Sequence, residues 1–239
     1  MKQFRAMKSV CSFSLLVYLC TFSTPVSAQS DSVAFSLKKG EVLDLLFLIQ
    51  KPETQALFKD YVRTAFPVGE EMSYKSLTGF RIGVNLQGNY QPQSLILAKW
   101  DNMEKRERFL TEIEDAVPDF HERRRAIWSS FCLTYYEVPS DINFAVRKGK
   151  FTVITAYWSD NERAFGRFKQ EWLKEVQRAG GRVSLLMEDG KSPLGYFYQP
   201  DLLIMTEWEN EESFELFHLL NLKMNHKGVK HVNQLALNY

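Results

Sequence analysis

An internal repeat is the feature that most constrains how this chain folds. Tyr90-Gln91-Pro92 recurs 108 residues later as Tyr198-Gln199-Pro200. In that register, ten of the twenty residues from 90 to 109 are identical to their counterparts, and Trp100 matches Trp208. A match in one ungapped register indicates two copies of a single structural unit. We therefore expect a tandem pair rather than one unrepeated domain.

The hydrophobic pattern predicts the same order of elements in both copies. In the first copy, strands are expected at 43–49, 80–86, 95–100 and 131–138. One helix follows the first of these strands and ends at Pro67 and Gly69, and a long helix covers 103–128. In the second copy, strands are expected at 151–158, 182–187, 202–208 and 234–239. One of its helices follows the capping box Ser159–Glu162, and the other covers 211–225.

The order strand-helix-strand-strand-helix-strand is that of the ferredoxin-like unit. In the third strand, Leu95 and Leu97 point to one face and Ile96 and Ala98 to the other, so both faces of the sheet need a cover. The fold class predicted is therefore α+β, with two ferredoxin-like units packed sheet to sheet as an internal pseudo-dimeric α+β barrel. The boundaries expected are a signal peptide at 1–28, a lead at 29–40, repeat 1 at 41–138, a linker at 139–149 and repeat 2 at 150–239.

The N-terminus has the three parts of a secretory signal. A basic start precedes a mostly apolar stretch from Val10 to Phe22, and small residues follow at Val26-Ser27-Ala28. We expect cleavage after Ala28 and a periplasmic or secreted protein; an uncleaved anchor is the alternative. The apolar stretch is shorter than the roughly 20 residues of a membrane span. Cys11 and Cys20 leave with this segment, so Cys132 remains alone, and we interpret it as a buried small hydrophobe.

Charge and motifs exclude several function classes. The 30 basic and 29 acidic residues are balanced, and removing Lys2, Arg5 and Lys8 with the signal takes the formal net charge from +1 to about −2. Nucleic acid is therefore not an expected partner. The sequence has no metal-ligand spacing, no phosphate-binding glycine loop and no nucleophile elbow. No metal is expected, and any catalysis must come from scattered polar groups.

The repeat also separates structural from functional candidates. Residues kept in both copies, such as Trp100 and Tyr90, are expected to encode the fold. Residues that differ at a core position are better functional candidates. His218 is one, because its counterpart is Leu110 and an imidazole titrates near neutral pH. We therefore take His218 as the catalytic candidate; the alternative is a histidine at the edge of the core.

Five further residues are binding candidates. Lys99 and Glu207 occupy matched positions and differ, and the pseudo-symmetry could bring them together across the barrel; the alternative is two separate exposed strand ends. Tyr135, Tyr157 and Trp158 lie on predicted strands and would suit an aromatic pocket, or plain core.

The second copy resembles the dimeric α+β barrel superfamily. The motifs are Gly180-Gly181-Arg182 before the second strand, Pro200 before the third, and Glu207-Trp208 followed by acidic residues and Phe214. The superfamily includes proteins like the antibiotic-biosynthesis monooxygenases and a related family of short domains of unknown function. Repeat 1 keeps the tryptophan and Tyr-Gln-Pro but has Thr78-Gly79-Phe80-Arg81 in place of Gly-Gly-Arg.

The resemblance implies several activities and settles none of them. The one favoured is a cofactor-free monooxygenase or isomerase acting on a small aromatic or apolar molecule in the barrel cavity. The alternatives are a non-catalytic small-molecule binder, a haem binder with an axial histidine or tyrosine, and a structural or interaction protein. Because the fused copies can satisfy their own interface, a monomer is expected.

Overall fold

The computed structural model describes residues 32–193 and 198–238. The predicted signal peptide, with Cys11 and Cys20, lies outside the described residues, as does Tyr239. Each repeat has the predicted order of strands. Repeat 1 consists of β2 (Val42–Gln50), α1 (Gln55–Glu71), β3 (Lys75–Gln87), β4 (Ser94–Trp100), α2 (Met103–Ala116), α3 (Phe120–Ile127) and β5 (Trp128–Glu137). Repeat 2 consists of β7 (Phe151–Ser159), α4 (Glu162–Arg178), β8 (Arg182–Glu188), β9 (Leu202–Trp208), α5 (Glu211–Asn221) and β10 (Val229–Asn238).

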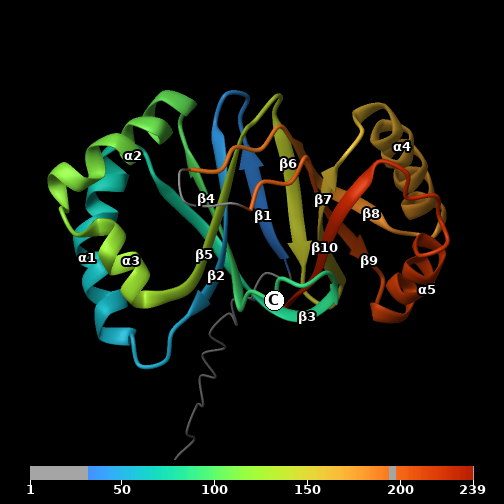
Figure 1. Ribbon diagram of the computed structural model, residues 1–239, viewed down its shortest axis with the longest axis horizontal. Coiled ribbons are helices and arrows are strands. Elements are labelled where there is room, and N and C mark those ends of the chain that lie inside the picture. Colours follow the sequence, from blue (N-terminus) through green and yellow to red (C-terminus); the bar gives the residue numbers. More distant parts are fainter. Residues whose placement is uncertain (1–31, 194–197, 239) are drawn as a thin grey trace, which may run out of the picture. The chain divides into compact units, whose positions relative to one another are not determined.

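The strand order confirms two ferredoxin-like units. Repeat 1 has the order β5-β2-β4-β3 and repeat 2 the order β10-β7-β9-β8, and all of these pairings are antiparallel. The two four-stranded sheets also join edge to edge, because β3 pairs with β10. The helices cover the outer faces, with α1, α2 and α3 on one flank and α4 and α5 on the other (Figure 1).

A backbone bridge between described residues connects the two free edges. Tyr135 in β5 donates its N–H to the carbonyl oxygen of Lys191 at 2.8 Å, and Lys191 donates back at 2.9 Å. Lys191 follows β8, so the bridge connects the last strand of the eight-stranded sheet to the first. The sheets of the two copies therefore face one another around a common interior, as an internal α+β barrel. This confirms the predicted fold class.

Two further strands occupy that interior. Strands β1 (Ser32–Leu37) and β6 (Ile142–Arg147) pair antiparallel in a separate ribbon. Phe35, Leu37, Phe144 and Val146 of the ribbon belong to the same buried apolar cluster as the inward-facing side chains of the eight strands. No strand is predicted from the sequence in the lead or the linker, where β1 and β6 lie. The barrel interior, which was the expected ligand cavity, is largely filled by apolar side chains.

Three helix boundaries differ from the sequence expectation. Helix α1 continues through Pro67 and Gly69 to Glu71. A proline removes one N–H and its bond to the carbonyl four residues earlier, which interrupts the hydrogen-bond ladder without always ending the helix. The long helix predicted for 103–128 is instead two helices, α2 and α3, separated at Val117 and Pro118. Helix α5 ends at Asn221, earlier than predicted.

Capping residues fix where helix α4 of repeat 2 begins and ends. Asn161, rather than Ser159 of the predicted capping box, caps α4, since its side-chain oxygen accepts the Ala164 N–H at 2.9 Å. Gly180 follows the end of α4 with a φ of +86°, a left-handed conformation that favours glycine, as predicted.

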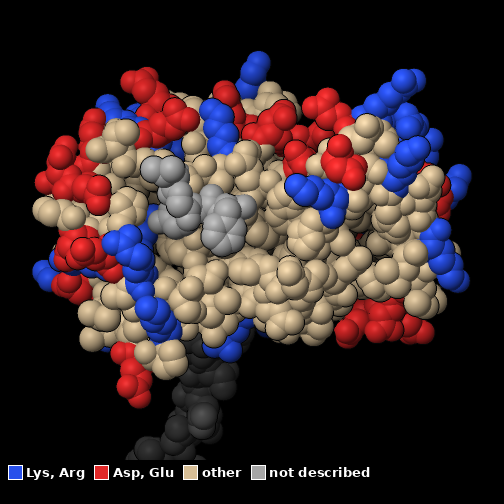
Figure 2. Space-filling model, in the orientation of Figure 1, with Lys and Arg blue, Asp and Glu red and all other residues tan. Residues whose placement is uncertain are grey.

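The surface carries both signs of charge. On the face shown in Figure 2, acidic and basic side chains are interspersed along the upper edge, while the middle is largely uncharged. No described helix is both long enough and apolar enough to cross a membrane.

Candidate functional site

A pocket of about 850 Å³ lies in repeat 1, between the outer face of the sheet and the three helices. We call it the repeat-1 pocket. Most of its lining is apolar or aromatic and comes from β2, β4, α1, α2 and the start of β5. These residues include Leu46, Leu48, Ile96, Val62, Ala65, Phe66, Phe109, Trp128 and Phe131.

Small residues on α1 explain why this space is open. Helices α1 and α4 are both 17 residues long and occupy equivalent places in their repeats. Aligned from their first residues, Ala65 corresponds to Trp172 and Gly69 to Val176. Trp172 and Val176 are 1% and 0% exposed and fill the core of repeat 2. Ala65 and Gly69 line the pocket instead, so repeat 1 lacks the side chains that close the equivalent space in repeat 2.

A buried ion pair forms part of the pocket wall. The Arg106 Nε donates to Asp44 Oδ1 at 2.8 Å, and the Trp100 Nε1 donates to Asp44 Oδ2 at 3.0 Å. The side chains of Arg106 and Asp44 are only 2% and 4% exposed. The guanidinium carbon also lies 5.2 Å from the centroid of the Trp100 ring and 4.8 Å from that of Tyr135. Because both carboxylate oxygens accept a hydrogen bond, Asp44 fixes the orientation of Arg106.

Repeat 2 has no such pair. At the 108-residue offset, Thr152 and Phe214 stand where repeat 1 has Asp44 and Arg106. Trp208, the counterpart of Trp100, donates its indole N–H to Thr206 at 3.0 Å. Sequence reasoning missed Asp44 and Arg106, although they differ from their counterparts at buried positions and so meet the criterion that selected His218.

A second arginine and two tyrosines add to the polar lining. The Arg124 Nε donates to the Tyr61 hydroxyl at 2.9 Å, and the guanidinium carbon lies 4.1 Å from the Phe120 ring centroid and 4.4 Å from that of Phe131. Burial raises the pKa of Tyr74 to about 12; the nearby Asp44 carboxylate adds to this shift and Arg124 opposes it. The Tyr74 side chain is therefore a neutral phenol at physiological pH.

His218, the catalytic candidate, lies away from this pocket. It is on α5 of repeat 2, where its ring stacks on Phe214 with a centroid distance of 5.7 Å. Its Nδ1 is buried and has no hydrogen-bond partner among the described residues. His218 does not line the repeat-1 pocket. Its catalytic role stays a prediction.

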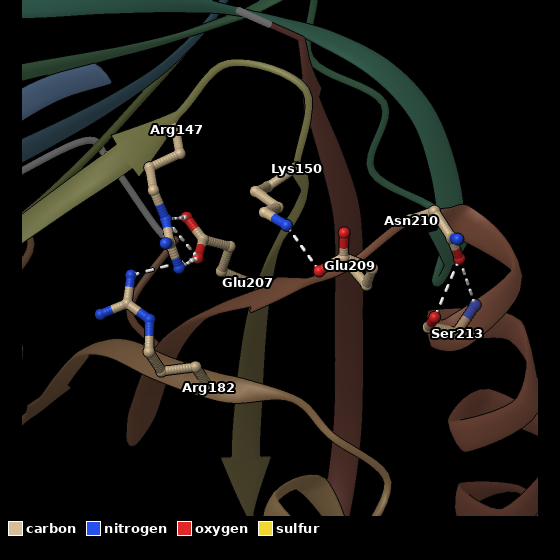
Figure 3. A network of polar contacts seen from close by, with 7 residues as sticks. All are labelled: Arg147, Lys150, Arg182, Glu207, Glu209, Asn210 and Ser213. Atoms are coloured by element: carbon tan, nitrogen blue, oxygen red, sulfur yellow. Dashed lines mark hydrogen bonds and ion pairs between the residues drawn. The ribbon is translucent and has the colours of Figure 1, made fainter. Parts of the chain in front are cut away.

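Lys99 and Glu207, which the pseudo-symmetry could have brought together, each have a different partner. Lys99 binds Glu41, with 2.6 Å between Lys99 Nζ and Glu41 Oε1. Glu207 binds Arg147 from the ribbon, and Arg182 of β8 at 3.2 Å (Figure 3). Neither residue is an exposed strand end, because the side chain of Lys99 is 20% exposed and that of Glu207 is 3% exposed. The ribbon supplies Arg147 as a partner for Glu207, and the sequence did not reveal this contact.

The pKa of Glu207 reflects these contacts. Burial alone would raise it, but hydrogen bonds from Arg147 and Arg182 lower it by more, so the net shift is downward. Next to it, Lys150 pairs with Glu209 at 2.5 Å, and the Asn210 side chain accepts the Ser213 N–H at the start of α5 (Figure 3). This network joins the ribbon to repeat 2 and is therefore a structural connection.

The three aromatic candidates lie in three places. The Tyr135 ring contacts Arg106 beside the repeat-1 pocket, and its hydroxyl donates to Glu107 at 3.4 Å. Tyr157 is 1% exposed in the core of repeat 2. Trp158 lines a second pocket of about 480 Å³, together with residues from both repeats that include Tyr90, Tyr198, Cys132 and His231. The predicted aromatic pocket is therefore not formed by these three residues together.

Metal and haem find little support in the repeat-1 pocket. Within residues 32–193 and 198–238, no group of three or more histidine, cysteine, aspartate or glutamate side chains is arranged to hold a metal ion. The axial haem ligand considered from the sequence is a histidine or a tyrosine, which binds as an imidazole or a phenolate. The described lining of this pocket includes no histidine, and the raised pKa of Tyr74 opposes a phenolate there.

No family model matches the chain, and no curated protein matches it. Solved structures do show similarity over most of the chain. A mutant chlorite dismutase from Candidatus Nitrospira defluvii is 9% identical, with 85% of this chain and 93% of that chain covered and a TM-score of 0.48. An anthrone oxidase-like protein is 14% identical, with coverages of 86% and 94% and a TM-score of 0.45. A monooxygenase candidate from Lactobacillus acidophilus NCFM is 10% identical, with coverages of 84% and 94% and a TM-score of 0.41.

The strand order and the barrel closure of this chain define its class. Two fused ferredoxin-like units around one interior make a tandem α+β barrel, the architecture of the superfamily that the motifs of repeat 2 resemble.

Proposed function

We propose that the repeat-1 pocket binds a small organic molecule with an apolar or aromatic body, and that the protein acts on it in the manner of cofactor-free monooxygenases or isomerases. The observation that supports this is the pocket itself. Its volume of about 850 Å³ is within the usual range for small-molecule sites, and a few polar groups converge on mostly apolar walls. The proposed site lies between sheet and helices, rather than in the filled interior of the barrel.

The polar groups of the pocket fit proton chemistry. Tyr74 is a neutral phenol that lines the pocket, so it can donate a hydrogen bond or a proton to a bound molecule. Asp44 is a poor general base, because both of its oxygens already accept hydrogen bonds. Its role is to hold Arg106 in place.

The binding proposal can be tested by filling the pocket as repeat 2 fills its own. Ala65→Trp places an indole at the position equivalent to Trp172, and Leu57→Trp adds the same indole on the exposed side of the same helix, where Leu57 is 51% exposed. We expect saturable binding of the neutral fluorescent probe N-phenyl-1-naphthylamine to the wild type and to Leu57→Trp, and its loss in Ala65→Trp. Equal binding by all three proteins would place the probe elsewhere and contradict the proposal.

Catalysis is a separate step of the proposal. Oxygen uptake measured with hydroxynaphthalenes should be present in the wild type and absent in Ala65→Trp. If the probe binds, but neither oxygen uptake nor isomerised product is detected over a panel of such compounds, the non-catalytic binding alternative is favoured.

We also propose that the protein is exported, since residues 1–28 have the three parts of a secretory signal. N-terminal sequencing of protein recovered from the cell envelope or the medium should begin at Gln29. An intact Met1 in that fraction would favour the uncleaved anchor.

A further inference from the structure

One guanidinium in the repeat-1 pocket has a donor group with no partner. Arg106 uses its Nε for Asp44, but its Nη1 is buried and makes no hydrogen bond to any described residue. A charged N–H group that is buried without an acceptor is costly, so native proteins rarely leave one in that state. Arg106 also lines the pocket, so its guanidinium lies at the wall against which a bound molecule would pack.

The charge of the lining favours an anion. The described residues that line the pocket include three arginines, Arg81, Arg106 and Arg124, and a single carboxylate, Asp44. Asp44 neutralises one of the arginines, and its two oxygens are already occupied. Arg81, which is exposed, adds a further positive charge to the lining.

We propose that the molecule bound in the repeat-1 pocket carries a carboxylate, which accepts a hydrogen bond from the Arg106 Nη1 while its apolar body lies against the aromatic lining. This inference rests on the proposed function and specifies its substrate class. A hydrogen bond from a guanidinium to a carboxylate is charge-assisted and stronger than one to a neutral acceptor. Asp44 acts as a positioning residue, since it fixes Arg106 and does not touch the ligand.

Two ligands of matched shape test the inference. 2-Naphthoate carries the carboxylate, and 2-naphthamide replaces it with a neutral group of similar size. Titration of each into the full-length protein by isothermal calorimetry should show 2-naphthoate binding on the order of 10- to 100-fold more tightly. Equal affinities would overturn the carboxylate inference and leave the pocket proposal standing. If neither ligand binds, both proposals fail.

Variants then place the preference at Arg106. Replacing Arg106 alone would leave Asp44 buried without its cation, so the variant imports the repeat-2 residues together, as Asp44→Thr, Ala98→Thr and Arg106→Phe. We expect 2-naphthamide to bind this variant and the preference for 2-naphthoate to disappear. Arg108→Gln is the control, because Arg108 lies on the same helix with its side chain 45% exposed. A preference that survives in the triple variant, or is lost in Arg108→Gln, would overturn the assignment to Arg106. If the triple variant does not fold, the wild-type comparison decides the inference alone.

Discussion

At the scale of single residues, the two repeats satisfy one tryptophan in two ways. The indole N–H of Trp100 is accepted by a buried carboxylate, and that of Trp208 by a threonine hydroxyl. The carboxylate is stable in its buried site only because Arg106 pairs with it. The repeat-2 solution needs no buried charge. The pair in repeat 1 therefore costs desolvation that the fold itself does not require.

Removing one member of this pair should be worse than removing both. We expect Arg106→Phe to lower the free energy of unfolding by about 3–5 kcal/mol, because Asp44 is left buried and unpaired. The triple variant Asp44→Thr, Ala98→Thr, Arg106→Phe should recover most of that loss, since it restores the repeat-2 set with an acceptor for Trp100. Urea denaturation followed by circular dichroism measures both. A triple variant no more stable than the single variant would contradict this account.

The buried tyrosines predict how the protein responds to alkali. Burial raises the pKa of Tyr74 to about 12 and also raises those of Tyr136, Tyr157 and Tyr198. A pKa raised in the folded state means that the stabilising contribution is complete below pH 10, the ordinary tyrosine value, and is lost as the pH rises through the folded pKa. Stability should therefore fall above pH 10. The tyrosinate absorbance of these four should appear together with the loss of the circular dichroism signal, and full ionisation before unfolding would contradict the prediction.

At the scale of elements, the ribbon of β1 and β6 supports the barrel from inside. Leu37 is 0% exposed and belongs to the interior cluster, while its neighbour Ser36 faces solvent. We expect Leu37→Ala to lower the free energy of unfolding by about 2–5 kcal/mol, because it leaves a cavity in the shared core. Ser36→Ala on the same strand is the control and should change it little. Similar losses in both variants would show that the ribbon does not support the core.

The ribbon also makes an acid-sensitive contact with repeat 2. Burial opposes ionisation of Glu207, but Arg147 and Arg182 lower its pKa below the ordinary glutamate value. A lowered pKa means that the contribution is present above the ordinary value of about 4.3 and is lost as the pH falls through the folded pKa. Glu207→Gln should therefore be less stable than the wild type at pH 7, and the difference should shrink below about pH 4. A difference that is constant over that range would contradict the prediction.

Most elements, but not all, could be read from the sequence. The eight barrel strands follow from apolar runs, and β9 was predicted at its observed bounds. The strands β1 and β6 were missed, although Val33, Phe35 and Leu37 alternate, as do Ile142, Phe144 and Val146. Paired residues of the two strands lie 105 to 115 residues apart in the sequence, for example Phe35 opposite Phe144, and the local pattern does not show which strand pairs with which. The break between α2 and α3 had a signal, Pro118, that was outweighed by the helical pattern around it.

The site was harder to predict than the fold. Asp44 and Arg106 were accessible through the comparison of the repeats, as were Ala65 and Gly69 once α1 and α4 are aligned. The open space of the repeat-1 pocket could not be predicted in this way, because it depends on how far α1 lies from the sheet. Lys99 and Glu207 were chosen by the same comparison, but two of their partners, Glu41 and Arg147, lie outside the matched strands.

At the scale of the whole molecule, the pairing of β3 with β10 and the bridge from Tyr135 to Lys191 use the edges of both repeats. We therefore expect a monomer, and light scattering coupled to gel filtration should give the mass of one mature chain. A dimer would contradict this. The exposed leucines of α5, Leu216, Leu219 and Leu220, would then be the first place to look for its interface.

The covalent fusion has a consequence for how such a barrel can specialise. In an assembly of two identical subunits, every substitution appears twice, so a change that opens a pocket in one half opens it in the other and removes core from both. Here Trp172 closes one half while Ala65 leaves the other half open. One unit can thus stay rigid as a scaffold while its twin gives up packing for a site. A chain that contains both halves can make them different, whereas a gene that encodes one subunit of a symmetric dimer cannot.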